Sequence, residues 1–514
     1  MKTQDSLVDQ HCTLKNVEVF CNSSGEPYGC TLNFSSVQVN SNKFYVIQLL
    51  KDQIQIGGAS TIPQYYLFTK YGRVGEPGTA SVKNHANSHA ATSAFLKTYR
   101  DKTSNEWGPI EKFVPKPNKY YRLEMAKIDV EEEEEHGEAA SAGCGTSLCT
   151  LEPEVKDFIG MISDKNVHMN ALLTFNIDTT KMPLGKISDK QIDKAYQILA
   201  VIDVILKAIE SGDWEKSAAL LGFPETYARS QIIECSNQFW RNVPYNCGRN
   251  TPPVIDTIEQ IQRLTELLEL IKNAEIAGKI IRRFDNVSDI YSKMCVDIKV
   301  VTDVGEKTII EQLIYGTHAP THNYGMEIME IFRVSKEMPP TTNSRAWFED
   351  LPNHRLLVHG SRMANFMGIL STGLRLPHPI QVANGSVLGR GIYFADVVTK
   401  SFNYCNVDCT NNIGFIALCE VALGDNPDLR EYPHSDPLRP GQTSRFALGK
   451  TTIDEEGWTD LTTDDGFIKD VKIPQGPLVT RKALTLNASF LYNEFVVFDT
   501  RQYRFKYIVK IKKV

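Results

Sequence analysis

A single carboxylate stands at the start of an apolar run near the end of the chain. The run LYNEFVVFD, residues 491–499, contains Glu494 followed by Phe495, Val496, Val497 and Phe498. Aromatic and β-branched residues of this kind fill covered strands. A carboxylate beside a covered strand is costly to bury unless it is paired or used. Glu494 is therefore the first candidate for a residue with a chemical role.

Two more polar residues interrupt runs that otherwise predict strands. His359 ends RLLVHGSR, and Tyr393 lies in GRGIYFAD. Each has a structural alternative: a satisfied histidine at a strand end, a core tyrosine, or a glutamate that simply pairs with a lysine. Their flanks favour a ligand site, because Gly360 leaves its backbone open to close approach and the GRG turn can present the Tyr393 ring.

The sequence lacks the common nucleotide and metal motifs. It contains no GxxxxGK[ST], no GxGxxG after a predicted strand and no HExxH. The closest cysteine pairs, Cys405/Cys409 and Cys144/Cys149, do not have zinc-ribbon spacing, so we expect reduced thiols and no metal. A dinucleotide, if one binds, is held on another fold and is not used for hydride transfer.

Composition predicts a globular protein of several domains. The chain has 514 residues, of which 42% are apolar and 23% charged, and its length suggests about three domains. No apolar run reaches the roughly 20 residues of a membrane span, and MKTQDSLVDQHC at the start has no apolar signal segment. We expect no membrane partner.

The net charge of −6 is unevenly distributed. Residues 41–127 carry thirteen Lys and Arg against six Asp and Glu, whereas residues 128–154 carry nine acids and no Lys or Arg. The acidic run VEEEEEHGEAASAGCG is typical of a solvated linker. The basic segment before it includes predicted strands at 43–50 and 64–75 and a predicted helix at 88–103.

Helical periodicity dominates residues 153–285. One helix begins with a capping-box pair, Ser188 and Gln191, and ends at Gly212. Its apolar stripe is Ile192, Tyr196, Leu199, Ile202, Leu206 and Ile209. A second stripe is Ile261, Leu264, Leu268 and Ile271. Both stripes predict the core of a helical bundle.

After about residue 290 the pattern changes to short β-rich runs between Gly, Pro, Asn and Asp loops. These runs are MCVDIKVVTD, IMEIFRVSK, RLLVHGS, GFIALCEVALG, NEFVVFD and RFKYIVKIKK. They favour a mostly antiparallel sheet. The fold class is therefore multidomain α+β: a small mixed domain, an all-α helical bundle and a mostly antiparallel β domain.

Several of these segments resemble the poly(ADP-ribose) polymerases. LLVHGSRMANFMGILSTGLRLP, GRGIYFADVVTKSFNYC, LYNEFVVFD and THAPTHN resemble the family's catalytic domain, YGRVG with KTYRDKTSNEW its WGR domain, and KMPLGKIS its helical regulatory domain. The module order is similar to the short, DNA-dependent members. The resemblance implies a WGR-like DNA-binding domain, an acidic linker, a helical regulatory domain and an ADP-ribosyltransferase domain, at residues 15–127, 128–152, 153–288 and 289–514.

The resemblance also implies that NAD⁺ is the substrate and that no metal takes part. The Gly360 backbone and the Ser401 hydroxyl would hold the carboxamide of nicotinamide. Tyr393 and Tyr404 would stack on its ring. Glu494 would bind the ribose 2′-hydroxyl, place charge near the developing cation and polarise the acceptor. The remaining implied residues are His359 on the adenosine ribose, Ser361 and Arg375 as further NAD⁺ contacts, and Lys400 near the donor site.

Two departures from the family pattern stand out. Tyr71 takes the place of the tryptophan in the WGR signature, giving Tyr71, Gly72 and Arg73, and we expect the aromatic face and the guanidinium to preserve the module. Ser386 takes the place of a tyrosine in the loop before GRGIYFAD, which removes an aromatic wall and puts NAD⁺ affinity in question.

The expected partners are broken or nicked DNA and acceptor proteins, among them the protein itself, histones and repair factors, which implies a nuclear location. The candidate DNA-binding residues are Tyr71, Gly72, Arg73, Lys97, Arg100, Lys102 and Trp107. Trp107 has core packing as its alternative. The acidic residues Glu131 to Glu135 and Ser141 are candidate automodification sites, and the helical domain is expected to restrain the catalytic domain until DNA binds. Alternatives are a mono-ADP-ribosyltransferase, a non-catalytic DNA-end scaffold and an NAD⁺ hydrolase.

Overall fold

The computed structural model divides the chain into two compact units. One unit contains residues 1–148 and 172–275, and the other contains residues 149–171 and 276–514. The division falls inside two helices, α3 (Lys165–Leu173) and α7 (Ile258–Ile281). The residues described are 2–3, 7–52, 63–125, 127–128, 151–177, 188–212, 214–215, 221–281, 283–284, 286–336, 344–377, 388–433, 436–482, 484–485 and 488–514.

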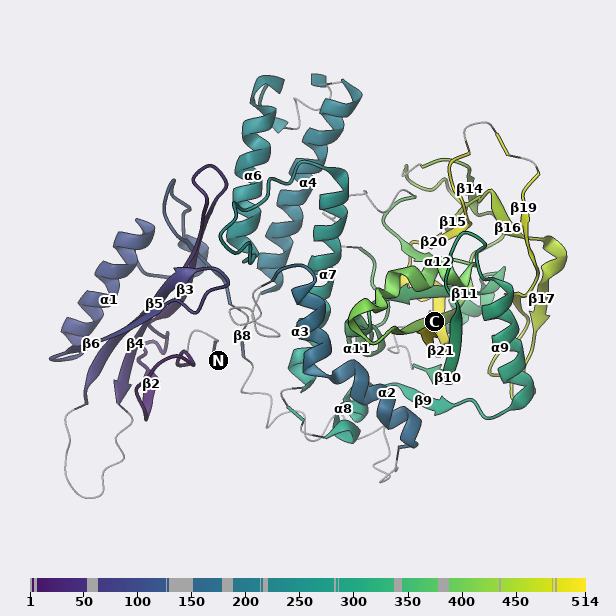
Figure 1. The fold of residues 1–514 in the computed structure, drawn as a ribbon, viewed down its shortest axis with the longest axis horizontal. Coiled ribbons are helices and arrows are strands. Elements are labelled where there is room, and N and C mark those ends of the chain that lie inside the picture. Colours follow the sequence, from purple (N-terminus) through teal and green to yellow (C-terminus); the bar gives the residue numbers. More distant parts are fainter. Residues whose placement is uncertain are drawn as a thin grey trace. The chain divides into compact units, whose positions relative to one another are not determined.

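The first unit contains an antiparallel sheet in the order β6-β5-β4-β3-β7, with β2 paired to β4 (Figure 1). Helix α1 packs on one face through Ala91, Phe95 and Tyr99. The strands and helix predicted at 43–50, 64–75 and 88–103 are therefore confirmed. The element bounds are β1 (Lys2–Thr3), β2 (Val17–Val19), β3 (Gly29–Ser36), β4 (Ser41–Asp52), β5 (Tyr65–Arg73), β6 (Thr79–His85), α1 (Ser88–Thr103), β7 (Tyr121–Arg122) and β8 (Lys127–Ile128).

The sequence did not predict strand β3, because polar residues occupy some of its buried positions and interrupt the apolar pattern. Asn33 and Ser35 are buried in this strand. The Asn33 amide donates to the Trp240 carbonyl at 3.0 Å, and the Asn237 amide oxygen accepts from the Val37 N–H at 2.7 Å. Polar residues on β3 thus pair with helix α6 (Ala228–Asn242) instead of facing water.

Helices α4 (Asp189–Ser211) and α6 lie side by side in the first unit (Figure 1). Ser188 caps α4 by accepting from the Gln191 N–H at 3.3 Å, and Gly212 ends it with a left-handed φ of 67°. The capping box is half formed, because the Gln191 side chain instead donates to the Asn242 carbonyl at 2.6 Å and accepts from the Glu124 N–H at 2.8 Å.

Most residues of the predicted apolar stripes are buried, but Leu206 is only partly buried and Ile209 is exposed. Ile261, Leu264, Leu268 and Ile271 are all buried in α7. Ile209 is 48% exposed near the end of α4, and Ile205 is buried in its place. The prediction for Ile209 was wrong because the stripe of a 3.6-residue period drifts around a long helix. No helix in the described ranges is long and apolar enough to span a membrane.

The second unit is built on two larger sheets, ordered β17-β18-β11-β13-β21-β10-β9 and β12-β20-β15-β14 (Figure 1). All six predicted strands are present, and most strand pairs are antiparallel, which confirms the predicted fold class. The strands are β9 (Asp297–Val300), β10 (Met326–Ser335), β11 (His354–Ser361), β12 (Ile392–Phe394), β13 (Ile413–Ala422), β14 (Asp428–Arg430), β15 (Ser444–Ala447), β16 (Thr451–Ile453), β17 (Trp458–Leu461), β18 (Val471–Pro474), β19 (Leu478–Thr480), β20 (Glu494–Val497) and β21 (Tyr503–Lys513).

Helices cover these sheets where the sequence did not predict them. Residues Met363 to Leu370 of α11 are all buried, so this helix has no polar face and no amphipathic period. The helices of the second unit that lie wholly within it are α2 (Pro153–Ser163), α8 (Val287–Lys293), α9 (Val304–Gly316), α10 (Ser344–Asp350), α11 (Met363–Thr372) and α12 (Val398–Phe402).

Helix α2 belongs to the core of the second unit, although the sequence places it in the helical domain. Phe158 stacks on Phe332 with ring centroids 5.2 Å apart and meets Phe415 edge-on at 4.8 Å. Asp157 forms an ion pair with Lys510 of β21 at 2.9 Å. The helical region predicted at 153–288 is therefore shared between the two compact units.

A histidine at the start of β11 is held by acceptors on both ring nitrogens. His354 Nδ1 lies 2.6 Å from Glu420 Oε1, and Nε2 lies 2.6 Å from the Leu351 carbonyl. Burial would lower the pKa of His354, but the hydrogen bond and charge of Glu420 outweigh it and raise the pKa above 6.5. Two acceptors require two N–H donors, so the folded state favours the imidazolium.

This geometry predicts a stability difference that depends on pH. Because the folded pKa of His354 lies above its unfolded value, its contribution is complete below about pH 6.5 and is lost as pH rises through the folded pKa. We expect His354→Gln to lower the Tm of the second unit at pH 6 and to have a shrinking effect toward pH 9. Thermal denaturation at several pH values measures this. The exposed His89, changed to Gln, is the control, and an equal His354→Gln effect at every pH would contradict the prediction.

Candidate active site

His359 is fixed by the backbone of the neighbouring strand. Its Nδ1 lies 2.9 Å from the carbonyl oxygen of Tyr393. A carbonyl only accepts, so Nδ1 carries the proton and Nε2 of the neutral ring is an acceptor. Burial lowers the pKa of His359, and the hydrogen bond to Tyr393 offsets only part of this effect. At neutral pH the histidine is therefore set up to accept a hydrogen bond from a hydroxyl group.

Gly360 turns its backbone toward an open stretch of strand edge. The N–H and C=O of Val358 both bond to Ala395, at 2.8 and 3.0 Å. Backbone groups two residues apart point to the same side of a strand, so those of Gly360 point beyond this bridge. Among the described residues no backbone group pairs with Gly360 there. A donor and an acceptor side by side match the two hydrogen-bonding groups of a carboxamide.

The absence of a side chain at Gly360 allows a helix to pack against β11, in addition to leaving the backbone open to a ligand. A Cβ atom at this position would lie 1.8 Å from the carbonyl oxygen of Ser401. Helix α12 can therefore approach β11 only because residue 360 is glycine. The Ser401 hydroxyl donates to the Val358 carbonyl at 2.9 Å, which holds it next to Gly360. The sequence argument explained this glycine by ligand approach alone and missed the helix contact.

Tyr393 is anchored through its hydroxyl group. The hydroxyl donates to the Gly389 carbonyl at 2.8 Å and accepts from the Leu388 N–H at 3.0 Å. Gly391 allows this turn to lie on β20, because a Cβ there would be 2.2 Å from Val496. Tyr404, the predicted partner of Tyr393 in a stacking pair, is 61% exposed after α12.

Glu494 and Lys400 form an ion pair. Lys400 Nζ lies 2.7 Å from Glu494 Oε1, and the two side chains are 18% and 19% exposed. The same ammonium donates to the carbonyls of Asn493 at 3.0 Å and Tyr492 at 3.4 Å. The lysine therefore holds both the carboxylate and the backbone that leads into β20. The resemblance places Lys400 only near the donor site, and the structure gives it a direct contact to Glu494.

A buried polar network lies directly behind Glu494. The Asn493 amide donates to Asp396 at 2.6 Å and to Thr452 at 2.8 Å, and its oxygen accepts from the Gly449 N–H at 2.9 Å. Arg481 also donates to the Asn493 oxygen at 3.2 Å. Burial raises the pKa of Asp396. These residues were missed from the sequence, because nothing in their spacing indicates that they meet.

Strand pairing brings the candidate residues of four elements together. Tyr393 is opposite Val496 in the β12–β20 pair, and Val358 of β11 bridges to Ala395 just after β12. The strands that carry His359, Tyr393 and Glu494 are thus neighbours, and α12 adds Lys400 and Ser401. Two further predicted contacts are Ser361, which follows Gly360 in β11 and accepts from the Asn365 amide at 3.0 Å, and Arg375, which follows α11 in the chain. Ser386 lies outside the described residues.

Arg73 of the WGR-like signature binds backbone within the first unit. Its guanidinium donates to the carbonyls of Gly248 and Asn250, the latter at 2.6 Å, and to the Asn40 side chain at 2.9 Å. Gly72 is required by packing, because a Cβ there would lie 2.7 Å from Gly78. Arg73 is a candidate DNA contact from the sequence, and these bonds engage its guanidinium with backbone and side-chain acceptors of its own unit.

The aromatic candidates of the first unit pack against their own domain. Trp107 meets Phe95 and Tyr99 edge-on at 4.8 and 4.9 Å, and the Arg122 guanidinium lies 4.1 Å from its ring. These contacts support the core alternative for Trp107 over stacking on a DNA end.

Two more residues join an aromatic stack. Tyr71 stacks on Tyr45 at 5.4 Å, and Lys102 Nζ lies 4.4 Å from the Tyr45 ring. Lys97 and Arg100 remain as exposed cations on α1, although Arg100 pairs with Glu106 at 2.7 Å. The acidic candidates Glu131 to Glu135 and Ser141 lie outside the described residues. Within the described ranges, no group of three or more His, Cys, Asp or Glu is arranged to hold a metal ion.

Comparison with known families matches three consecutive parts of the chain. The model of the poly(ADP-ribose) polymerase catalytic domain matches residues 305–513, the model of the regulatory domain of the same family matches residues 149–293, and the WGR domain model matches residues 28–114. The order of the three matches is the order predicted from the sequence motifs.

Similar curated proteins cover nearly the whole chain. Human poly [ADP-ribose] polymerase 2 is 32% identical over 523 residues, which span 98% of this chain and 83% of that protein. Arabidopsis thaliana poly [ADP-ribose] polymerase 2 is 30% identical over 94% of this chain and 73% of its own length. Chicken poly [ADP-ribose] polymerase 1 is 35% identical over 99% of this chain, and the chain spans 47% of that relative's length.

The contact between Gly360 and Ser401 predicts a severe effect for a very small substitution. Gly360→Ala forces α12 away from β11, so we expect a loss of about 1–3 kcal/mol of stability from overpacking. Because Lys400 and Ser401 move with α12, we expect activity to fall at least about tenfold. Thermal denaturation and a turnover assay measure the two effects.

Gly160→Ala in α2 is the matched control, because nothing lies within 4 Å of the added methyl group. It should be neutral or stabilise by up to about 1 kcal/mol, since Ala favours helices over Gly. A Gly360→Ala protein with the stability and activity of the Gly160→Ala protein would contradict the packing argument.

Proposed function

The chain belongs to the poly(ADP-ribose) polymerase family, and on that premise we propose that it is an NAD⁺-dependent ADP-ribosyltransferase activated by DNA strand breaks. It cleaves the bond between nicotinamide and ribose and transfers ADP-ribose to protein side chains and to a growing polymer. The observation that carries this proposal is the Lys400–Glu494 ion pair next to the strands of His359 and Tyr393.

The reaction mainly requires that the substrate is held in position and that a negative charge stabilises the transition state. The electron pair of the bond from ribose C1′ to the pyridinium nitrogen leaves with nicotinamide, which becomes neutral, and an oxocarbenium-like ribose remains. An acceptor oxygen then bonds to C1′ and loses its proton. Related transition states in glycoside hydrolysis are also stabilised by a carboxylate. The enzyme therefore needs to hold NAD⁺ in place and to set a negative charge beside the reacting carbon.

Each candidate residue has a part in this scheme. The Gly360 N–H and C=O bind the carboxamide, with Ser401 beside them, and the Tyr393 ring stacks on nicotinamide. His359 accepts from a ribose hydroxyl on the adenosine side. Glu494 binds the 2′-hydroxyl of the nicotinamide ribose and helps to remove the proton of the acceptor, while Lys400 keeps the carboxylate in position.

DNA dependence is assigned to the first unit. Its basic segment, residues 41–127, includes the exposed Lys97 and Arg100, and phosphate contacts from such side chains bind DNA without reading its sequence. Broken or nicked DNA, acceptor proteins including the protein itself, histones and repair factors are the proposed partners, in the nucleus. The acidic residues Glu131 to Glu135 and Ser141 stay proposed automodification sites.

Contacts within the first unit support communication between the DNA-binding and helical parts. Arg73 binds the carbonyls of Gly248 and Asn250, and Asn33 binds the end of α6. Through these contacts a change in the sheet on DNA binding would have a direct path to the helices. We propose that residues 172–275 restrain catalysis until DNA shifts this equilibrium, as a second ligand biases a two-state element.

Glu494→Gln tests the assigned chemistry. It removes the negative charge but nearly keeps the shape, so we expect polymer formation to fall at least about a hundredfold while DNA binding is unchanged. Labelled NAD⁺ is incubated with the protein, with and without nicked 5′-phosphorylated DNA, and the products are separated on a denaturing gel.

The gel separates the alternatives. A DNA-dependent smear from the unchanged protein supports a polymerase, and one sharp band indicates a mono-ADP-ribosyltransferase. Absence of label with intact DNA binding indicates a scaffold, and NAD⁺ consumption without protein label indicates a hydrolase. Glu327→Gln, at an exposed position of β10, is the matched control. Robust polymer from Glu494→Gln would refute the role given to the carboxylate.

A deletion tests the restraint. Because α2 contributes Phe158 to the core of the catalytic unit, removal must begin after this helix. Replacing residues 172–275 by a flexible linker is expected to give activity without DNA at the level of the DNA-stimulated full chain. The same deletion combined with Glu494→Gln is the control for background labelling. A deletion protein that still requires DNA would rule out the restraint.

A further inference from the structure

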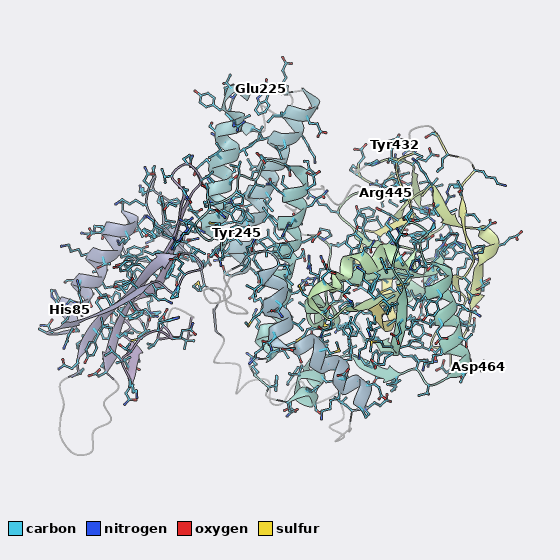
Figure 2. All side chains as sticks on the ribbon, viewed as in Figure 1. His85, Glu225, Tyr245, Tyr432, Arg445 and Asp464 are labelled. Carbon is cyan, nitrogen blue, oxygen red and sulfur yellow. The ribbon has the colours of Figure 1, made fainter. Side chains whose placement is uncertain are left out.

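Arg445 is a fully buried arginine outside the residues assigned above. It lies in β15 among the strands of the smaller catalytic sheet (Figure 2), and its side chain is 0% exposed. Its Nε donates to Asp428 Oδ2 at 2.7 Å. Burying a guanidinium costs free energy unless its N–H groups are hydrogen-bonded. The partners of these N–H groups therefore identify the segments that Arg445 holds.

Other contacts of Arg445 join separate segments. Nη1 donates to the Leu388 carbonyl at 2.6 Å, and Nη2 donates to the Asp436 carbonyl at 2.6 Å. The guanidinium also lies 5.7 Å from the centre of the Phe498 ring. One side chain thus connects the turn at residues 388–391 to β14 and to the end of β20.

The turn that Arg445 holds is the one that holds Tyr393. The N–H of Leu388 donates to the Tyr393 hydroxyl at 3.0 Å, and this hydroxyl donates to the Gly389 carbonyl at 2.8 Å. Gly389 has a φ of 104°, a conformation that strains other residues. A Cβ there would also lie 3.1 Å from Phe498 and 3.4 Å from Arg445 Nη1. The turn therefore has little freedom while the guanidinium is present.

We propose that Arg445 is a positioning residue that sets the orientation of the Tyr393 ring through the Leu388–Gly389 turn. This inference rests on the proposed function, in which that ring stacks on nicotinamide. Arg445 does not touch the reacting atoms. Its effect is on how well NAD⁺ and nicotinamide-like rings bind, and the chemical step is left nearly unchanged.

Arg430 offers a matched control. It donates to the same Asp428 oxygen at 2.9 Å, and its side chain is 18% exposed. Within the described residues Arg430 makes no hydrogen bond to the turn at 388–391. Arg430→Met and Arg445→Met therefore each remove one cation from Asp428, but only the second releases the Leu388 carbonyl.

The first experiment compares these two variants in the full chain with nicked DNA. For Arg445→Met we expect KM for NAD⁺ to rise about tenfold with kcat within about threefold, because binding geometry is lost and chemistry is not. The Kd for benzamide, which carries the ring and carboxamide alone, should rise by a similar factor. Arg430→Met should change both by less than about twofold. Equal effects of the two variants would overturn the proposal.

A double variant separates positioning from stability. Arg445→Met leaves a buried carboxylate with one cation fewer, so its Tm should fall. Adding Asp428→Asn removes that charge, and Tm should recover because losing both partners of a buried pair costs less than losing one. KM should stay raised, because the hydrogen bond from residue 445 to the Leu388 carbonyl of the turn is still missing. Recovery of KM together with Tm would show that Arg445 acts on stability alone.

Tyr393→Phe tests the route of the effect. Without the hydroxyl the turn no longer holds the ring, so Arg445→Met should raise KM by less than about twofold on this background. Effects that multiply would overturn the route through the hydroxyl. These experiments distinguish failure of the proposed function from failure of the positioning role. If the unchanged protein neither consumes NAD⁺ nor binds benzamide, the function is refuted. If the unchanged protein is active and Arg445→Met has the same KM and Kd, only the positioning role is refuted.

Discussion

A carboxylate that is only 19% exposed at the start of an apolar strand needs a cation within hydrogen-bond distance, and Lys400 supplies one to Glu494 at 2.7 Å. The same ammonium bonds to two carbonyls before β20, so it fixes the strand as well as the charge. Since Lys400 precedes Ser401 on α12, the ion pair also fixes the helix that packs on Gly360. Removing either partner leaves a mostly buried charge without its counter-charge.

The backbone beneath this ion pair is held by one buried amide. Asn493 is 1% exposed, and its side chain bonds to Asp396, Thr452, Arg481 and the Gly449 N–H. Both N–H donors and the oxygen of this amide are used, and a buried amide with all its hydrogen bonds made adds rigidity. Asn493 therefore fixes the backbone that carries the carboxylate, and Lys400 fixes the carboxylate itself through the ion pair. Arg445 performs the corresponding task for Tyr393, with a guanidinium in place of an amide.

The candidate residues that were found without the family resemblance are those that contrast with their surroundings. Glu494 and His359 interrupt apolar strands, and this contrast was visible without a structure. Asn493 and Arg445 gave no such signal, because their partners are distant in sequence: Asp396 is 97 residues from Asn493, and Leu388 is 57 residues from Arg445. Helix α11 and strand β3 were missed for a related reason, since neither has one polar and one apolar face.

Periodicity identifies a helix but not its partner, and the helical region shows the difference. The apolar stripe of α2, which includes Phe158 and Ile162, has the same spacing as that of α4, yet α2 packs into the catalytic core while α4 packs with α6. A helix that forms part of the catalytic core cannot leave it without exposing that core. If DNA controls catalysis through this region, the change must therefore take place in residues 172–275, with α2 in place throughout.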